Sequence, residues 1–170
     1  MVEFLHAKTF SINFIKGLDK FSGISYHSVM GNLNDYNWYV GQSLLNCQRI
    51  EHDVKIIYAA MKEGDFKENL VLAGEITLAD CLHALKELQK GLNPPVLDNS
   101  DFALLKEIKS VRNWLAHRCY VDFLYVGESQ LNSRMQECFQ KVRDFCEKTT
   151  ALCAVVEKAR FYVLKKFNRI

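Results

Sequence analysis

The 170-residue sequence contains only two prolines and eight glycines. Their scarcity favours long uninterrupted helices and weakens any all-β fold built on many tight turns. A strong net charge is also missing, because 22 basic and 20 acidic residues leave +2, which is not typical of a nucleic-acid coat protein. The length and the 49% apolar content fit a single compact domain that needs no metal or disulfide to fold.

Cysteine motifs and long apolar runs are absent as well. No C-x-x-C pair occurs, so the sequence has neither a zinc-ribbon nor a thioredoxin motif. The first eleven residues have no apolar core of a signal peptide, and no run approaches the ~18 residues that a membrane span needs. We therefore expect a cytoplasmic protein without membrane association, with reduced cysteines that pack as small hydrophobes; disulfide pairing is the less favoured alternative. The cysteines are Cys47, Cys81, Cys119, Cys138, Cys146 and Cys153.

Helical periodicity is what the sequence does contain. In residues 1–37, which we interpret as an N-terminal extension, a helix is predicted over Ala7–Lys20 and a loop at Asn32, Asn34 and Asp35. From Trp38 a helix is predicted up to Lys62, with Gly64 as its stop. Its apolar stripe, at alternating spacings of four and three, consists of Val40, Leu44, Cys47, Glu51, Val54, Tyr58 and Met61.

Three further helices are predicted. A loop containing Gly74 leads to Thr77, which with Asp80 resembles a capping box at the start of a helix to Lys90. Asn99-Ser100-Asp101 caps a helix to about Tyr120, and an apolar stretch, Val121–Val126, follows. In residues 131–163 the apolar positions alternate at spacings of four and three, which predicts a long closing helix of about 35 residues. We predict an all-α, antiparallel helical bundle of four to five helices in residues 38–170.

Glu51 interrupts the apolar stripe of its helix. A carboxylate in a core-facing position is costly unless it has a partner, and Lys55 lies four residues further on. One interpretation is that the pair serves structure or function. The other is that the stripe reaches the surface here and the pair is an ordinary exposed ion pair.

The second unusual feature is Arg112-Asn113-Trp114-Leu115-Ala116-His117. We expect Leu104, Ile108, Val111 and Leu115 to form the buried side of this helix. Arg112 and His117 are about 140° apart on an ideal helix, so they meet at one phosphate only if Arg112 reaches across or a second chain contributes. The side expected to face away from the core carries Lys109, Arg112, Asn113, Ala116, His117 and Tyr120.

These residue types suit phosphodiester chemistry. Arg112 can bind a phosphate through two N–H groups, and His117 can transfer the proton of a 2′-hydroxyl. Asn113 can orient the imidazole ring or the phosphate. Cleavage of RNA by its own 2′-hydroxyl requires no metal, and we expect neither a metal nor another cofactor. Because an arginine and a histidine at this spacing are common on helices, His117 is alternatively a favourable partner for the helix dipole.

The segment Val111–Tyr120 resembles the R-x4-His signature of HEPN-domain proteins, and Glu51–Lys55 resembles the E-x3-K element in an earlier helix of many of them. The resemblance implies a small all-α protein, and active members are metal-independent endoribonucleases that act as dimers, with two motifs facing one cleft. It implies that Arg112 holds the scissile phosphate, His117 transfers protons, Asn113 orients, and Glu51 and Lys55 brace the site. Tyr120 is one position later than the tyrosine that follows the motif in HepT-type toxins, so that regulation is not carried over.

The resemblance predicts a homodimer that cleaves RNA as a toxin or a phage-defence or stress effector, with a cognate antitoxin or regulatory protein as a further candidate partner. The alternatives are a catalytically silent module that binds RNA, a nucleotide or a protein, and a helical interaction protein whose seam over residues 131–163 pairs with another chain. Additional RNA contacts are expected from the basic C-terminal end, which is alternatively a solvated helix end. The residues expected to contact RNA are Arg118, Lys158, Arg160, Lys165 and Lys166.

Overall fold

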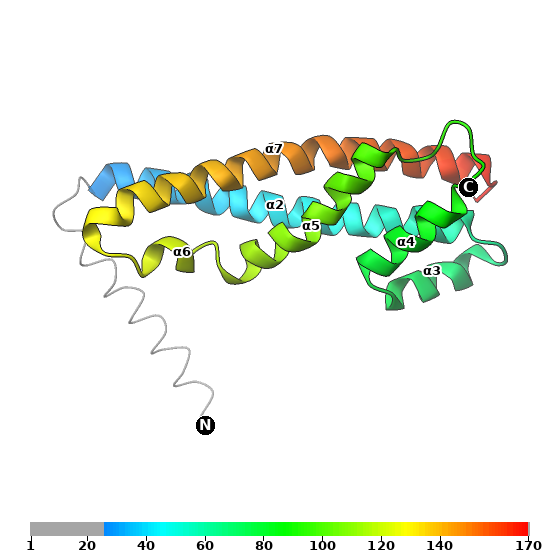
Figure 1. Ribbon diagram of the computed structural model, residues 1–170, viewed down its shortest axis with the longest axis horizontal. Helices are drawn as coiled ribbons and strands as arrows, with labels where there is room; N and C mark the ends of the chain where they lie inside the picture. Colours follow the sequence, from blue (N-terminus) through cyan, green and yellow to red (C-terminus); the bar gives the residue numbers. More distant parts are fainter. Residues whose placement is uncertain (1–25, 170) are drawn as a thin grey trace, which may run out of the picture. The chain divides into compact units, whose positions relative to one another are not determined.

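The computed structural model describes residues 26–169, with side chains from Leu33 onward except that of Glu128 (Figure 1). The helix expected over Ala7–Lys20 lies outside these residues. The chain divides into two units after Trp38. The described residues form helices and no strand, which confirms the all-α helical bundle. The helices are α2 (Tyr26–Met61), α3 (Phe66–Glu75), α4 (Leu78–Leu88), α5 (Asn99–His117), α6 (Val121–Leu124) and α7 (Glu128–Lys166).

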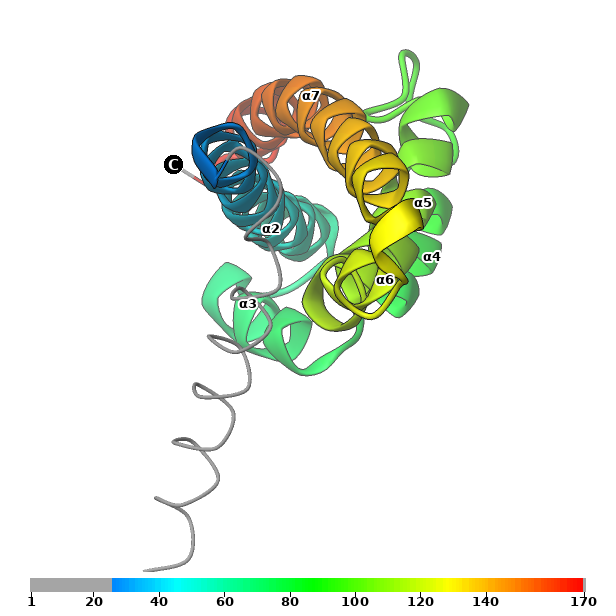
Figure 2. The ribbon, with the colours of Figure 1, turned by 90° about the vertical axis from the view of Figure 1, so that its left-hand side faces the viewer.

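The helices α2 and α7 pack side by side and run in the same direction (Figures 1 and 2). Their contacts keep a nearly constant offset along the chain, as expected for parallel helices: Asn46 meets Thr149, and Asp53 meets Arg160. The antiparallel arrangement holds for α5 against α7, where Trp114 lies near Lys141 and Glu107 near Lys148. The long helix α5, which comes between α2 and α7 in the sequence, runs in the opposite direction. The chain therefore returns before α7 begins, and α7 is parallel to α2.

Several polar groups are buried between α2 and α7. The amide of Asn46 donates to the hydroxyls of Thr149 (3.2 Å) and Thr150 (3.0 Å). Arg160 donates to Asp53 at 2.9 Å, and the two side chains are only 21% and 13% exposed. Arg169 donates to the carbonyl oxygens of Ala60 and Lys62 at the C-terminal end of α2, where backbone carbonyls lack partners within the helix. Apolar residues of both helices are buried as well, among them Ile50, Val54, Ile57, Val142, Val156 and Val163.

The prediction of a loop at Asn32, Asn34 and Asp35 is wrong, because α2 begins at Tyr26 and passes through these positions. Asn34 and Asp35 are exposed there, where their weak helix propensity costs little, while Tyr36 is buried.

The buried side of α2 also differs from the predicted stripe. Ser43, Asn46, Ile50 and Ile57 are buried, whereas Leu44, Glu51 and Tyr58 are half-buried. Polar residues take part in the contact with α7, which apolar spacing alone does not reveal.

The region expected to be a loop around Gly74 contains a helix instead, α3. Asp65 caps its first turn by accepting from the backbone N–H of Glu68 at 3.0 Å, and Asn69 donates to the last carbonyls after α2. With the short α6 this makes six helices in the described part, where four to five were expected.

The other helix starts were predicted correctly or nearly so. Thr77 caps α4, and α5 begins one residue earlier than expected, with Asp98 and Asp101 forming a reciprocal capping box. The closing helix spans 39 residues, slightly longer than expected. None of the helices in the described range is both long and apolar enough to cross a bilayer.

We expect Asp53→Ala to lower the free energy of unfolding by about 2 kcal/mol, because Arg160 is then left charged and largely buried, with only the longer pair to Glu157 at 3.7 Å remaining. Urea denaturation followed by circular dichroism measures the change. Asp53→Leu combined with Arg160→Met removes both charges and should restore much of the loss. As a control, Arg143→Ala breaks the exposed pair with Glu147 and should change the stability little. An equally small effect for Asp53→Ala would contradict the role given to the pair.

Candidate functional site

Glu51 forms ion pairs with two cations on different helices. Its Oε2 atom lies 2.6 Å from Nη1 of Arg112 on α5, and its Oε1 atom lies 3.5 Å from Nζ of Lys55 on α2. Lys55 also donates to the carbonyl oxygen of Gly74 at 3.2 Å, which links the group to α3. We call Glu51, Lys55 and Arg112 the Glu51 cluster. The carboxylate is only 24% exposed, so the pair with Lys55 is not an ordinary surface ion pair.

The orientation of α5 explains why Arg112 reaches Glu51. The buried residues along its middle and end are Leu105, Ile108 and Leu115, whereas Leu104 and Val111 are only half-buried. The buried side of α5 is therefore rotated about the helix axis toward Arg112, relative to the buried side that the sequence predicts. The expectation that Arg112 lies opposite the core is wrong, because its guanidinium lies at the edge of the core and contacts α2.

Asn113 and His117 of the motif are not part of the Glu51 cluster. Asn113 and His117 are exposed, as is Lys109 one turn earlier, and His117 lies in the last turn of α5. Tyr120, after the helix, is half-buried against Phe123 with 6.1 Å between ring centroids, and burial raises the pKa of its hydroxyl. The structure brings together Arg112, Glu51 and Lys55, and it does not bring His117 of the same chain to Arg112.

The residues expected to contact RNA are dispersed, and three of them bind groups of the protein itself. Arg118 pairs with Asp122 at 3.0 Å, Arg160 is held by Asp53, and Lys166 donates to the hydroxyl of Tyr162. For Arg160 the packing role accounts for the position, because its side chain is mostly buried. Lys158 and Lys165 are exposed on α7.

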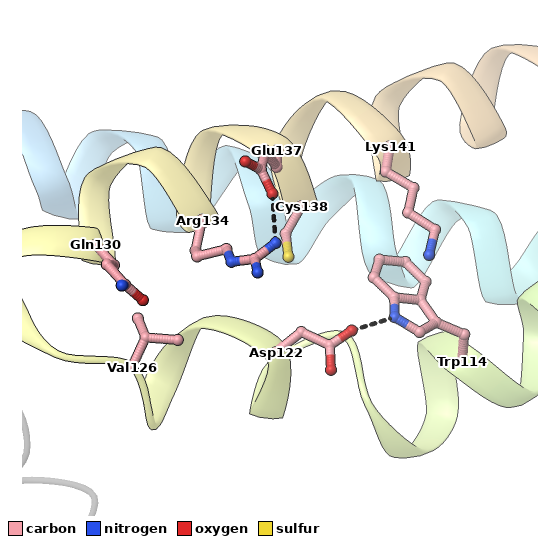
Figure 3. Close-up of a pocket in the computed structure, with 8 residues that line it drawn as sticks. All are labelled: Trp114, Asp122, Val126, Gln130, Arg134, Glu137, Cys138 and Lys141. Carbon is pink, nitrogen blue, oxygen red and sulfur yellow. Dashed lines mark hydrogen bonds and ion pairs between the residues drawn. The ribbon is translucent and has the colours of Figure 1, made fainter.

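A pocket of about 390 Å³ lies between α7 and the segment formed by the end of α5 and α6 (Figure 3). We call it the Trp114 pocket. The indole N–H of Trp114 donates to Asp122 at 2.7 Å, and the ammonium of Lys141 lies 3.8 Å from the centre of the indole ring. Sequence reasoning missed this pocket. The signal available was a row of polar residues on one side of the closing helix. Its lining residues are Trp114, Asp122, Val126, Gln130, Arg134, Glu137, Cys138 and Lys141.

All six cysteines are buried and free, as predicted. Cys47 and Cys81 lie close to the Glu51 cluster, and burial raises the pKa of each thiol to about 12, although Arg112 and Lys55 respectively oppose the shift. Thiols with such pKa values stay protonated at neutral pH and are poor nucleophiles. Within residues 26–169, histidines, cysteines and carboxylates do not gather in a group able to hold a metal ion.

Comparison of the chain with models of protein families, with curated proteins and with solved structures finds no match. The site is therefore interpreted from its own geometry and from the sequence resemblance.

We expect the native protein to react very slowly with iodoacetamide at pH 8, because Cys47 and Cys81 are protonated and all six thiols are buried. Intact-mass spectrometry should show the same thiols alkylated rapidly once the chain is unfolded in urea. Ser110→Cys, at an exposed position of α5, supplies a reactive control. Rapid labelling of Cys47 or Cys81 in the folded protein would contradict the assignment.

The same shifts predict how stability depends on pH. The folded state raises both pKa values from 9.0 to about 12, so the unfolded chain loses these protons first as pH rises. The contribution of these thiols to stability should be complete below pH 9 and should decrease between pH 9 and about 12.

Proposed function

We propose that the protein is a metal-independent endoribonuclease of the HEPN type that uses Arg112 and His117. The observation that carries the proposal is the Glu51 cluster. Glu51, the first residue of the segment that resembles the E-x3-K element on α2, contacts the arginine of the R-x4-His motif on α5 directly, and Lys55 contacts the same carboxylate. The two motifs are about sixty positions apart in the sequence, and their meeting at one carboxylate supports reading them as parts of one site.

In this proposal each residue has a role that its position permits. Arg112 is 44% exposed, so its remaining N–H groups can bind a phosphodiester oxygen while Glu51 holds the guanidinium. Lys55 adds a second positive charge beside the same carboxylate. His117 accepts the proton of the 2′-hydroxyl or gives a proton to the departing 5′-oxygen, and Asn113 orients the strand. The 2′-oxygen attacks phosphorus, the bond to the 5′-oxygen breaks, and the products are a 2′,3′-cyclic phosphate and a 5′-hydroxyl.

The proposal includes a homodimer, because Arg112 and His117 of the same protomer do not meet. Arg112 points toward α2, whereas His117 is exposed about 140° further around α5. A second copy that packs its α5 against the first would place four such groups around one strand. Two histidines would then be available as the base and the acid that the reaction requires. An enzyme of this kind would act as a toxin or a phage-defence or stress effector, with an antitoxin or regulatory protein as a possible partner.

One observation favours a second candidate, a catalytically silent module that binds RNA, a nucleotide or a protein. The guanidinium of Arg112 already forms an ion pair with Glu51 at 2.6 Å, which is sufficient reason for an arginine at this position without catalysis. The activity test below separates the two functions.

We expect the purified protein to cleave single-stranded RNA in the presence of EDTA and to leave 2′,3′-cyclic phosphate ends. His117→Ala and Arg112→Ala should each lower the cleavage rate by at least about a hundredfold, because proton transfer and phosphate binding each contribute on that scale. The same substitutions should relieve growth arrest if expression of the protein is toxic.

His83→Ala is the matched control, because His83 is an exposed histidine on α4, away from the motif. It should leave the rate unchanged. Cleavage that persists in His117→Ala, or that needs a divalent cation, would rule out the mechanism. Folded protein that binds RNA without cutting it would favour the silent module.

We further expect the protein to be a dimer at micromolar concentration by multi-angle light scattering. Ala116→Arg, on the exposed side of α5, should weaken the dimer because it adds a bulky charge where two copies of the motif would meet. Ala103→Arg, also on an exposed position of α5 but near its start, should not. A monomer at all accessible concentrations would contradict the paired motif.

A further inference from the structure

The Trp114 pocket carries a charge arrangement that the proposed reaction does not use. Both carboxylates in its wall have partners: Asp122 accepts from Trp114 and Arg118, and Glu137 accepts from Arg134. Lys141 has no carboxylate within ion-pair distance among the described residues, and its ammonium rests on the indole ring instead. The pocket therefore contains one cation that forms no ion pair of its own.

Arg134 adds unsatisfied donors. Only its Nη1 atom contacts Glu137, at 2.8 Å, so the other N–H groups of the guanidinium are available to a ligand. Figure 3 shows Arg134 and Lys141 extending from α7 toward the pocket, with Asp122 and Trp114 on the opposite wall. An anion bound by both cations would compensate the charge of Lys141.

Trp114 gives the pocket a rigid flat wall. The hydrogen bond of 2.7 Å from its indole nitrogen to Asp122 fixes the edge of the ring, and Arg118 in turn holds the same carboxylate. The flexible side chain of Lys141, an exposed residue on α7, lies over a face of the ring. A planar ligand can displace that side chain and stack on the indole without disturbing its hydrogen bond.

The pocket volume of about 390 Å³ is within the range of small-ligand sites. A planar ring to stack on Trp114 together with an anionic group for Lys141 and Arg134 is the chemistry of a nucleotide. We propose that the Trp114 pocket binds one nucleotide unit, with its base on the indole and its phosphate between Lys141 and Arg134.

The source of that unit is either a free nucleotide or a nucleotide within an RNA strand. Trp114 and His117 are three residues apart on α5, hence neighbours about 60° apart on its surface. A strand with its scissile phosphate at His117 would thus reach the pocket with an adjacent nucleotide. This second source rests on the proposed function, whereas the first does not.

The test is an NMR titration of the full chain carrying Trp38→Phe, so that Trp114 gives the single tryptophan indole signal. AMP should shift this signal to saturation, whereas ribose 5-phosphate and inorganic phosphate should bind at least about ten times more weakly, because they lack the stacking base. Lys141→Ala should weaken AMP binding at least about fivefold, because it removes the cation of the pocket that forms no ion pair of its own. Lys106→Ala, an exposed lysine on α5 outside the pocket, should leave AMP binding unchanged.

No shift with AMP would overturn the proposal. Equal affinity for AMP and inorganic phosphate would also overturn it, because the pocket would then be an anion site without a base platform. An equal effect of Lys141→Ala and Lys106→Ala would have the same consequence.

A short single-stranded RNA added to the His117→Ala chain identifies the source. A shift of the Trp114 signal by RNA assigns the pocket to the strand, and a shift by AMP alone assigns it to a free nucleotide. Binding of AMP by a protein that cleaves no RNA would leave this proposal standing while the proposed function fails.

Discussion

The parallel contact between α2 and α7 is the constraint on which the arrangement of the other helices depends. Apolar side chains alone would allow the two helices to slide past one another, but the ion pair of Asp53 with Arg160 and the bonds of Asn46 to Thr149 and Thr150 fix their relative position. A slip by two turns would leave these buried groups without partners. Because the first and last long helices are parallel, α5 must carry the chain back between them, and that antiparallel passage places Arg112 opposite Glu51.

Much of this fold follows from local sequence signals. Thr77 and the segment Asn99-Ser100-Asp101 indicate helix starts, because such side chains satisfy backbone N–H groups within one turn, although the residue that caps α5 is Asp98. The regular spacing over residues 131–163 indicates the long closing helix. The direction of α2 relative to α7 could not be predicted in this way. It depends on contacts between residues about a hundred positions apart, such as Asp53 with Arg160, and these leave no periodic trace in either helix.

The candidate site was only partly predictable, for a related reason. Spacing identified Glu51 as unusual on its helix and Arg112 as a candidate phosphate ligand, but it misjudged which side of α5 is buried. Leu104 and Leu105 are adjacent and equally apolar, so the sequence does not distinguish a buried side containing one from a buried side containing the other. The structure buries Leu105, and the resulting rotation moves Arg112 from the solvent-facing side to the contact with α2. The Trp114 pocket depends on how α6 packs against α7, and sequence spacing carries no such information.

The Glu51 cluster also bears on how Arg112 can serve a ligand while it is held by the protein. One carboxylate between two cations leaves a net positive charge at a partly buried place, so an incoming phosphodiester adds the missing negative charge and need not displace Glu51. The ion pair then fixes the guanidinium before the ligand arrives, which reduces the rotational freedom lost on binding. Arg118 lacks this arrangement, because a single exposed pair with Asp122 already compensates its charge. Of the two arginines near the end of α5, Arg112 is therefore the one whose surroundings favour a bound phosphate.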